Sequence, residues 1–309
     1  MRIIYMGTPE FAVKPLESLV NHYDVVMVVS QPDKRVGRKQ ILKDTPVKEF
    51  AIEKNIEVFQ PENIKKDYQK IIDKKPDLII TCAYGQIIPK ELLDYPEYGC
   101  INIHASLLPK LRGGAPIHKA IMEGYKETGI TIMYMDVAMD SGDMIAQRKV
   151  TIEEEDTLES LSLKLANVSK DFIMEVLPSI IDKTNKRIPQ NKEEVTYAYN
   201  IKREEEHLDF NLESEKIYNH IRGLSPSPSA NLILDGEEVK VYASRISNNT
   251  YPDKKNGEIV KVYKDGIGIK TKDSEIILLE IKPFGKKKMS VRDYLNGVKK
   301  EELIGKIVR

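Results

Sequence analysis

Apolar and polar positions in the amino-terminal part of the chain follow two alternating patterns. Short apolar runs bounded by turn residues predict buried strands at 2–6, 24–30, 77–82 and 100–104. Between these runs, apolar residues recur every three to four positions, which predicts amphipathic helices. Strands that are apolar along most of their length and alternate with helices are typical of parallel sheets. The fold class predicted for this part is α/β, with a Rossmann-like, mostly parallel sheet.

The same patterns predict the remaining elements of this part. Further strands are expected at 56–59 and 129–135, and helices at 11–20, 46–53, 64–73, 117–123 and 157–181. From 182 to 206 the residues are polar and lack sustained periodicity, which indicates a linker with short elements.

After residue 207 the pattern becomes β-rich. A helix is predicted over 213–224, followed by about five short strands with turns at Asp235-Gly236, Asn256-Gly257 and Asp265-Gly266. A helix with such strands is typical of a small β-barrel, and an oligonucleotide-binding (OB) type fold is one candidate. The 309 residues are therefore divided into a domain over 1–189, a linker over 190–207 and an OB-like barrel domain over 208–309.

Composition narrows the class of protein. No apolar run approaches the roughly 20 residues needed to cross a bilayer, and the amino terminus lacks the features of a secretory signal. We therefore expect a cytoplasmic protein that does not bind membranes. Cys82 and Cys100 both lie in predicted buried strands without a nearby histidine, so reduced thiols are expected rather than a disulfide or a zinc site.

The net charge is zero, but cationic residues gather in the barrel domain. Between residues 240 and 292, 13 Lys and Arg residues stand against 6 Asp and Glu residues. Such an excess can attract a polyanion, and a solvated lysine-rich surface explains it equally well. The chain lacks both G-x-G-x-x-G and G-x-x-x-x-G-K-[ST], which disfavours an NAD-type oxidoreductase and a P-loop triphosphate site.

The strand over 100–104 carries two polar side chains on one face. Because strand side chains alternate, Asn102 and His104 point the same way, about 7 Å apart. Ser106 and Pro109 end the strand, and ligands of open α/β sheets bind beyond such carboxyl ends. A catalytic pair is one reading of this pattern. Two structurally satisfied buried side chains are the other.

Two loops carry further candidate chemistry. The connection 31–43 holds five cationic residues and a glycine, so it can meet phosphates or remain a solvated loop. The loop 136–143 holds three aspartates whose spacing fails the EF-hand pattern. An aspartate facing an imidazole is the better hypothesis, because a carboxylate fixes the tautomer of a histidine. Asp136 and Asp143 are read as turn formers.

Five segments together resemble one known family. They are Met6-Gly7-Thr8-Pro9-Glu10-Phe11-Ala12, Gln31-Pro32-Asp33 with Gly37-Arg38 and Pro46-Val47-Lys48, Ala83-Tyr84-Gly85, Ile101 to Pro116, and Thr131 to Met144. Over essentially its full length the chain resembles the methionyl-tRNA formyltransferases. The Asn-x-His and Ser-Leu-Leu-Pro element with a later Asp is shared by folate-dependent formyltransferases of this fold, whereas the cationic Gln-Pro-Asp loop points to the tRNA enzymes.

This resemblance implies roles for particular residues. The catalytic residues it implies are Asn102, His104 and Asp140. The folate-contacting residues it implies are Ser106, Leu107, Leu108 and Pro109, with Tyr84, Gly85 and Ile88 at the pterin pocket. The tRNA-contacting residues it implies are Arg38, Lys39 and Lys43 in the loop and Lys286, Lys287 and Lys288 in the barrel. No metal is implied. The co-substrate would be 10-formyltetrahydrofolate, the partner initiator methionyl-tRNA, and the expected state a monomer.

The implied reaction moves a formyl group from 10-formyltetrahydrofolate to the α-amino group of the methionyl ester on initiator tRNA. One departure from the family pattern lies at Ser225-Pro226-Ser227-Pro228, where many members have a tryptophan and this chain has none. Two alternatives stay open. A formyltransferase acting on an amino-sugar nucleotide or on glycinamide ribonucleotide would keep the same three catalytic residues, and a non-catalytic RNA-binding protein would leave them inert.

Overall fold

The computed structural model describes residues 1–36 and 40–309, which form two compact units. The N-unit consists of residues 1–116, 127–151 and 162–199, and the C-unit of residues 117–126, 152–161 and 200–309. Two internal stretches, which lie between segments of the N-unit in the sequence, therefore belong to the C-unit. The domain boundaries at 189 and 208 stay a prediction.

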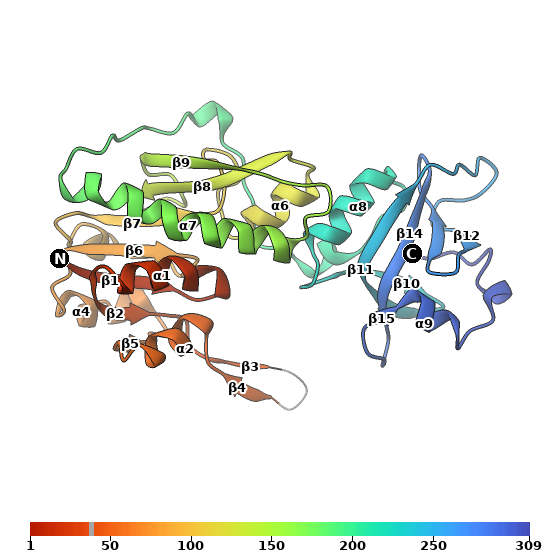
Figure 1. Cartoon of the computed structure of the whole chain (residues 1–309), viewed down its shortest axis with the longest axis horizontal. Helices are drawn as coiled ribbons and strands as arrows, with labels where there is room; N and C mark the ends of the chain where they lie inside the picture. The colour runs from red at the N-terminus through yellow and green to blue at the C-terminus, as the bar shows by residue number, and fades with distance from the viewer. Residues whose placement is uncertain (37–39) are drawn as a thin grey trace. The chain divides into compact units, whose positions relative to one another are not determined.

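A seven-stranded sheet forms the centre of the N-unit, in the order β5-β2-β1-β6-β7-β8-β9 (Figure 1). The first five strands of this order run parallel, whereas β8 runs antiparallel to both of its neighbours. This confirms the mostly parallel α/β sheet. The strands span Arg2–Gly7 (β1), Asp24–Val29 (β2), Val58–Phe59 (β5), Leu78–Cys82 (β6), Cys100–His104 (β7), Glu127–Tyr134 (β8) and Met144–Thr151 (β9).

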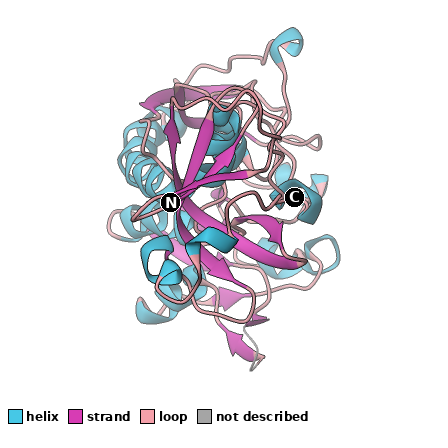
Figure 2. Cartoon of the chain, turned by 90° about the vertical axis from the view of Figure 1, so that its right-hand side faces the viewer, coloured by secondary structure: helices cyan, strands magenta, loops and turns pink. Residues whose placement is uncertain are grey.

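The long helix α7 runs across one face of this sheet (Figure 1), and Figure 2 shows helices in cyan beside the strands in magenta. The residue before α2 shows why a helix begins there: the Thr45 side chain accepts a bond from the Lys48 amide, and Pro46 occupies the first turn. The helices outside the C-unit stretches span Val13–Val20 (α1), Pro46–Glu53 (α2), Ile64–Asp67 (α3), Gln69–Ile72 (α4) and Lys90–Leu93 (α5), and α7 spans Leu158–Ile181.

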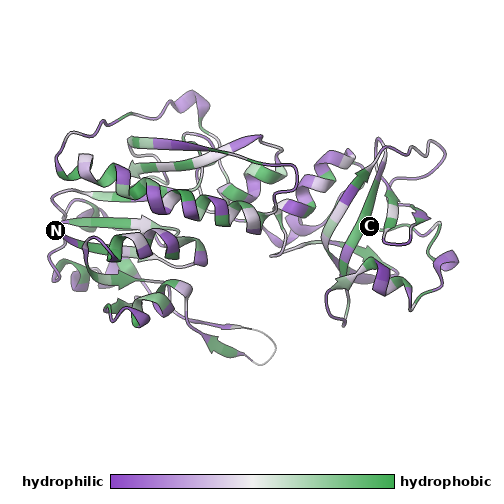
Figure 3. Ribbon diagram, in the orientation of Figure 1, coloured by the Kyte–Doolittle hydropathy of each residue, from purple (hydrophilic) through white to green (hydrophobic). Residues whose placement is uncertain are grey.

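The strand order places a ligand-binding edge beside β1. Both β2 and β6 pair with β1, so the chain reverses its direction of progress across the sheet at this strand. Crevices at such reversals, outside the carboxyl ends of the strands, are where open α/β sheets bind ligands. Every residue of β6 is buried, in keeping with its hydrophobic composition (Figure 3). β7, with Asn102 and His104, lies next to β6.

The C-unit contains a second sheet, in the order β10-β11-β14-β13-β12, with β15 paired to β14. Residues 306–309 link its two edges, because Ile233 of β10 exchanges backbone hydrogen bonds with Arg309, and Val308 bonds to Gly257 before β12. This closure agrees with the predicted small barrel. The strands span Ala230–Leu234 (β10), Glu237–Ser247 (β11), Ile259–Val262 (β12), Ile267–Lys270 (β13), Glu275–Pro283 (β14) and Met289–Ser290 (β15).

Helix α8 connects the barrel to the two internal stretches of the C-unit. The Arg222 guanidinium donates to the backbone oxygens of Glu153 (3.1 Å) and Asp156 (2.8 Å), and the Tyr218 hydroxyl donates to that of Glu154 (3.0 Å). A side chain at Gly223 would meet Met122 at 2.7 Å. The C-unit helices span Pro116–Met122 (α6), Ser214–Gly223 (α8) and Val291–Leu295 (α9).

Several local elements differ from the sequence prediction. The connection 31–43 contains a two-stranded hairpin, with β3 at Lys34–Val36 and β4 at Ile41–Lys43. The helix expected over 64–73 consists of two one-turn helices, α3 and α4. Strand β9 and the short helices α5 and α9 were not expected. β9 was missed because it lies at the edge of the sheet: most of its residues are partly or fully exposed, and its only apolar run is the three residues at its start.

Candidate active site

Asn102 lies in the middle of β7, between Thr81 of β6 and Met133 of β8. The Thr81 hydroxyl donates to Asn102 Oδ1 at 2.8 Å. This bond orients the amide, so that Nδ2 points away from β6 and lies 3.4 Å from Asp140 Oδ1. At that length the second bond is weak, which leaves Nδ2 available to another acceptor.

His104 ends the same strand, and the residue is 5% exposed. Nε2 lies 3.0 Å from the backbone oxygen of Leu111. Because a carbonyl oxygen only accepts, Nε2 carries the hydrogen in this arrangement. The other ring nitrogen, Nδ1, lies 3.7 Å from Asp140 Oδ2 and is the edge of the ring that faces the aspartate.

Asp140 comes from the loop between β8 and β9 and completes the group. Its φ angle of 47° lies in the left-handed region, where aspartate is one of the few tolerated residues. The Gly113 amide donates to Asp140 Oδ2 at 2.8 Å. An amide and an imidazole from β7 and a carboxylate from the β8–β9 loop therefore converge at one place.

The backbone of the loop after β7 is held by Thr131 of β8. The Thr131 hydroxyl donates to the Ser106 oxygen at 2.7 Å and accepts from the Leu108 amide at 3.1 Å. Gln147 of β9 donates to the Leu108 oxygen at 2.7 Å and to the Thr131 hydroxyl at 2.9 Å. The predicted folate segment from Ser106 to Pro109 is thus fixed from β8 and β9.

The predicted pterin residues occupy different environments. Tyr84 and Ile88 are buried in the core cluster that also contains Cys100. Between them, Gly85 adopts a φ angle of 92°, in the region that favours glycine. The Tyr84 hydroxyl is buried and has no partner within residues 1–36 and 40–309. Ile87, which the sequence did not single out, is 67% exposed in the same loop.

The predicted tRNA contacts are only partly described. Arg38 and Lys39 lie outside the described residues. Lys43 is exposed in β4, at the base of the hairpin. At that base, Lys48 of α2 forms ion pairs with Asp33 and Asp44, which tie the two ends of the connection to the N-unit.

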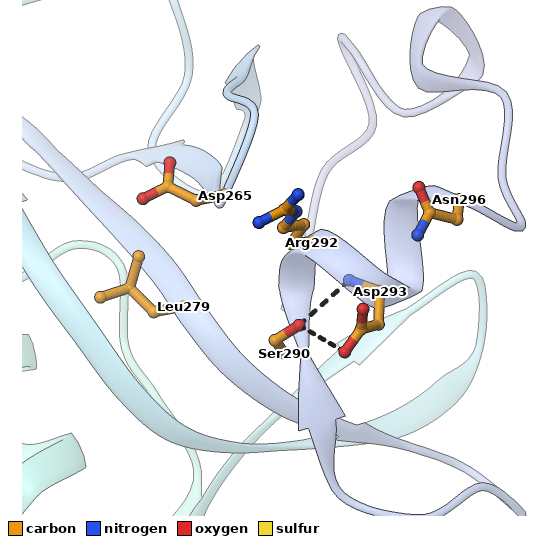
Figure 4. Close-up of a pocket in the computed structure, with 6 residues that line it drawn as sticks. All are labelled: Asp265, Leu279, Ser290, Arg292, Asp293 and Asn296. Atoms are coloured by element: carbon orange, nitrogen blue, oxygen red, sulfur yellow. Dashed lines mark hydrogen bonds between the residues drawn. The ribbon is translucent and has the colours of Figure 1, made fainter.

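In the C-unit, Lys286, Lys287 and Lys288 follow β14. The Lys286 ammonium lies over the Tyr294 ring at 5.7 Å, and that of Lys288 over the Tyr242 ring at 4.6 Å. Nearby, a cavity of about 610 Å³ is lined by polar side chains (Figure 4). It contains none of the three converging residues. Its lining residues are Asp265, Leu279, Ser290, Arg292, Asp293 and Asn296.

The structure adds two residues that the sequence did not reveal, Thr81 and Gly113. Each contacts the converging group from a segment distant in sequence, so no local pattern could have identified it. Cys82 and Cys100 are buried free thiols, and burial raises the pKa of Cys82 to about 12. In the described part of the chain no group of three or more His, Cys, Asp or Glu side chains could hold a metal ion. No described helix is long and apolar enough to span a membrane.

Family models match most of the chain. The formyl transferase model matches residues 1–177, and the model of the formyl transferase C-terminal domain matches residues 200–299. A methionyl-tRNA formyltransferase of Bacillus licheniformis is 47% identical over 300 residues, covering 96% of this chain and 95% of that protein. One from Macrococcus caseolyticus is 46% identical and covers 98% of this chain and 97% of that protein.

Solved structures give the same fold at lower identity. A sugar 3N-formyl transferase, crystallised with dTDP and 5-N-formyl-THF, matches with a TM-score of 0.68 and 20% identity, covering 93% of this chain and 99% of that chain. A methionyl-tRNA formyltransferase from Clostridium thermocellum matches with a TM-score of 0.56 and 21% identity, covering 80% of this chain and 94% of that one. With both formyl transferase models matched and near full-length relatives above 45% identity, the chain belongs to the methionyl-tRNA formyltransferase family.

Proposed function

We propose that this chain transfers the formyl group of 10-formyltetrahydrofolate to the α-amino group of initiator methionyl-tRNA. The observation that carries the proposal is the 47% identity, over 96% of the chain, with an enzyme named for this substrate. Likeness to the sugar formyl transferase is limited to 20% identity and supports only the fold. The amino-sugar alternative is therefore less supported.

The reaction joins the amino nitrogen to the formyl carbon and breaks the bond from that carbon to N10 of the folate. The carbonyl oxygen gains negative charge as the carbon becomes tetrahedral, and the attacking nitrogen must lose a proton. N10 takes up a proton as it leaves. The site must therefore supply hydrogen-bond donors at the oxygen and a proton acceptor at the nitrogen.

The converging residues fit these two requirements. Asn102 Nδ2, oriented by Thr81, is a donor for the developing oxyanion. His104 donates from Nδ1 when that nitrogen carries a hydrogen, because Nε2 is occupied by the Leu111 oxygen. Asp140 holds the His104 ring and, directly or through water, accepts the amine proton, which then passes to N10 as it leaves.

The chain also offers features that fit a folate. The predicted pterin loop leaves one buried hydroxyl, that of Tyr84, without a partner in the described part of the chain. Ile87 adds an exposed apolar side chain there, and apolar walls with a few convergent polar groups are typical of small-molecule sites. In this proposal Ser106 to Pro109 form the second side of the folate site.

For tRNA the proposal uses cationic residues in both units. The hairpin connection carries Arg38, Lys39 and Lys43, and the C-unit carries Lys286, Lys287 and Lys288. Contacts from such residues to phosphates provide affinity that depends on salt. A cytoplasmic location and a monomeric state are parts of the same proposal, and sedimentation at working concentration tests the second.

The deciding experiment supplies 10-formyltetrahydrofolate with one acceptor at a time. The acceptors are charged initiator tRNA, a panel of amino-sugar nucleotides, and glycinamide ribonucleotide. Formylated methionyl-tRNA as the preferred product supports the proposal. A formylated sugar or glycinamide ribonucleotide would replace it, and tRNA binding without consumption of the folate would indicate a non-catalytic RNA-binding protein.

A further inference from the structure

Asp140 holds an unfavourable backbone conformation at the centre of the site. A non-glycine residue at φ 47° lies in the sparsely populated left-handed region, so surrounding contacts must maintain it. The loop is also tight two residues later, because an added Cβ at Gly142 would overlap the Tyr134 carbonyl. The groups that bond to this backbone therefore decide where the Asp140 carboxylate points.

One side chain, Gln190, supplies two of those bonds. Its Nε2 donates to the backbone oxygens of Asp140 at 2.8 Å and Gly142 at 2.9 Å. Gln190 is 9% exposed, so these bonds are shielded from water. It lies in the segment that the sequence marks only as a linker.

Arg112 fixes the orientation of the Gln190 amide. Both Nε (3.0 Å) and Nη2 (2.7 Å) of the guanidinium donate to Gln190 Oε1, and Arg112 is 8% exposed. A flipped amide would place its NH₂ group against the guanidinium and its oxygen against two carbonyls. Both contacts would be repulsive, so only one orientation is stable.

The segment that contains Arg112 also holds the side chain of Asp140. The Arg112 amide donates to the Thr196 oxygen (2.9 Å), and the Ala198 amide donates to the Arg112 oxygen (2.7 Å). The next residue, Gly113, donates to Asp140 Oδ2 at 2.8 Å. Residues 112 and 113 therefore position Asp140 in two ways. Arg112 acts on its backbone through Gln190, and Gly113 bonds to its carboxylate directly.

We propose that Gln190, oriented by Arg112, is a positioning residue that holds the Asp140 backbone so that its carboxylate faces His104 Nδ1 and Asn102 Nδ2. Neither residue touches the reacting atoms. This role rests on the proposed formyl transfer, in which Asp140 supports His104 and accepts a proton.

Gln190→Glu separates this role from a merely structural one. A glutamate keeps and strengthens the bond to Arg112, but it presents oxygen to the Asp140 and Gly142 carbonyls. We expect kcat for methionyl-tRNA formylation to fall about 10- to 100-fold in the folded variant, with both KM values nearly unchanged. Gln190→Met, which loses both sets of bonds, should lower kcat to a similar extent.

The control is Gln69→Glu, because Gln69 is exposed on α4 and donates only to Asp73 among the described residues. It should retain full kcat. A Gln190→Glu enzyme with wild-type kcat, or with a raised KM at unchanged kcat, overturns the inference. If Gln190→Glu and Gln190→Met fail to fold, Arg112→Lys decides by the same criterion, because it retains Gln190 and the buried charge.

Hydrogen exchange at the Gly113 amide supplies a readout that does not depend on activity. In the folded Gln190→Glu protein this amide should exchange about tenfold faster than in wild type, because its acceptor Asp140 is no longer held. Unchanged protection contradicts the inference even if the chain formylates another acceptor. Absence of formyl transfer by the wild-type chain, with faster exchange in the variant, refutes only the proposed function.

Discussion

Asn102 depends on Thr81 for the direction of its amide, and this orientation leads to a direct test. Asn102→Ala removes one donor from the developing oxyanion. We expect kcat to fall by about 10² to 10³, the usual effect of losing such a donor, while folate binding stays nearly intact. Steady-state kinetics with methionyl-tRNA and equilibrium binding of the folate measure the two quantities. Reduced folate affinity with little change in kcat would contradict the assignment.

At the residue scale, the sequence predicted the pair on β7 but not its surroundings. The alternation of strand side chains was enough to place Asn102 and His104 on one face. The aspartate from the next loop came from the family resemblance. Thr81, Gly113 and Gln190 could not be inferred, because their contacts join segments 21 to 50 residues apart and leave no local pattern.

At the scale of elements, the β3–β4 hairpin is the candidate contact to tRNA in the N-unit. Lys43→Ala removes one exposed cation at its base. We expect a higher KM for tRNA, an unchanged KM for the folate, and a salt dependence of kcat/KM whose logarithmic slope is smaller by about 1. Lys90→Ala, which removes an exposed lysine paired with Asp94 on α5, is the control. An equal effect of both substitutions would indicate general electrostatics rather than a contact by the hairpin.

Strand β9 supports the predicted folate segment through Gln147. Gln147→Leu removes the bonds to the Leu108 oxygen and the Thr131 hydroxyl. Two lost hydrogen bonds correspond to about a tenfold rise in KM for 10-formyltetrahydrofolate, with kcat changed much less. Kinetics at saturating tRNA measure this split. Lys149→Leu on the same strand, whose ammonium pairs with exposed Glu127, should have no such effect.

The elements that the sequence predicted best are the buried ones. The boundaries of β7 match the prediction, since its residues form a compact apolar run. β9 and the β3–β4 hairpin escaped prediction because most of their residues are partly or fully exposed and the strands of the hairpin have only three residues each, so neither shows a clear hydrophobic period. Such strands owe their conformation to pairing with a neighbour, which a single sequence does not display.

At the scale of the whole molecule, acid stability is expected to depend on His118 in α6. Burial, with a contribution from Lys119, lowers the pKa of His118 from 6.5 to about 4. The folded chain therefore keeps this ring neutral while the unfolded chain protonates it below about pH 6.5. Its contribution to stability is full above that pH and is lost as the pH falls toward 4, by about 3 kcal/mol in total. His118→Gln should unfold with a shallower pH dependence between 6.5 and 4 in denaturant titrations. Parallel curves for the two proteins would contradict this.

The division of the chain into units was only partly accessible from sequence. A change from helix-strand alternation to short strands indicated a second domain near residue 208. The assignment of 117–126 and 152–161 to the C-unit depends on tertiary contacts and leaves no compositional trace.

The contacts of α8 with those two stretches restrict how this protein can be altered by recombination. A gene joined at residue 200 would carry the barrel without the carbonyls of Glu153 and Asp156, and the buried Arg222 guanidinium would lose both acceptors. A foreign barrel joined at that point would also bring a helix whose surface does not match the residues around Met122. The two halves of the gene are therefore expected to be inherited together rather than exchanged as separate cassettes.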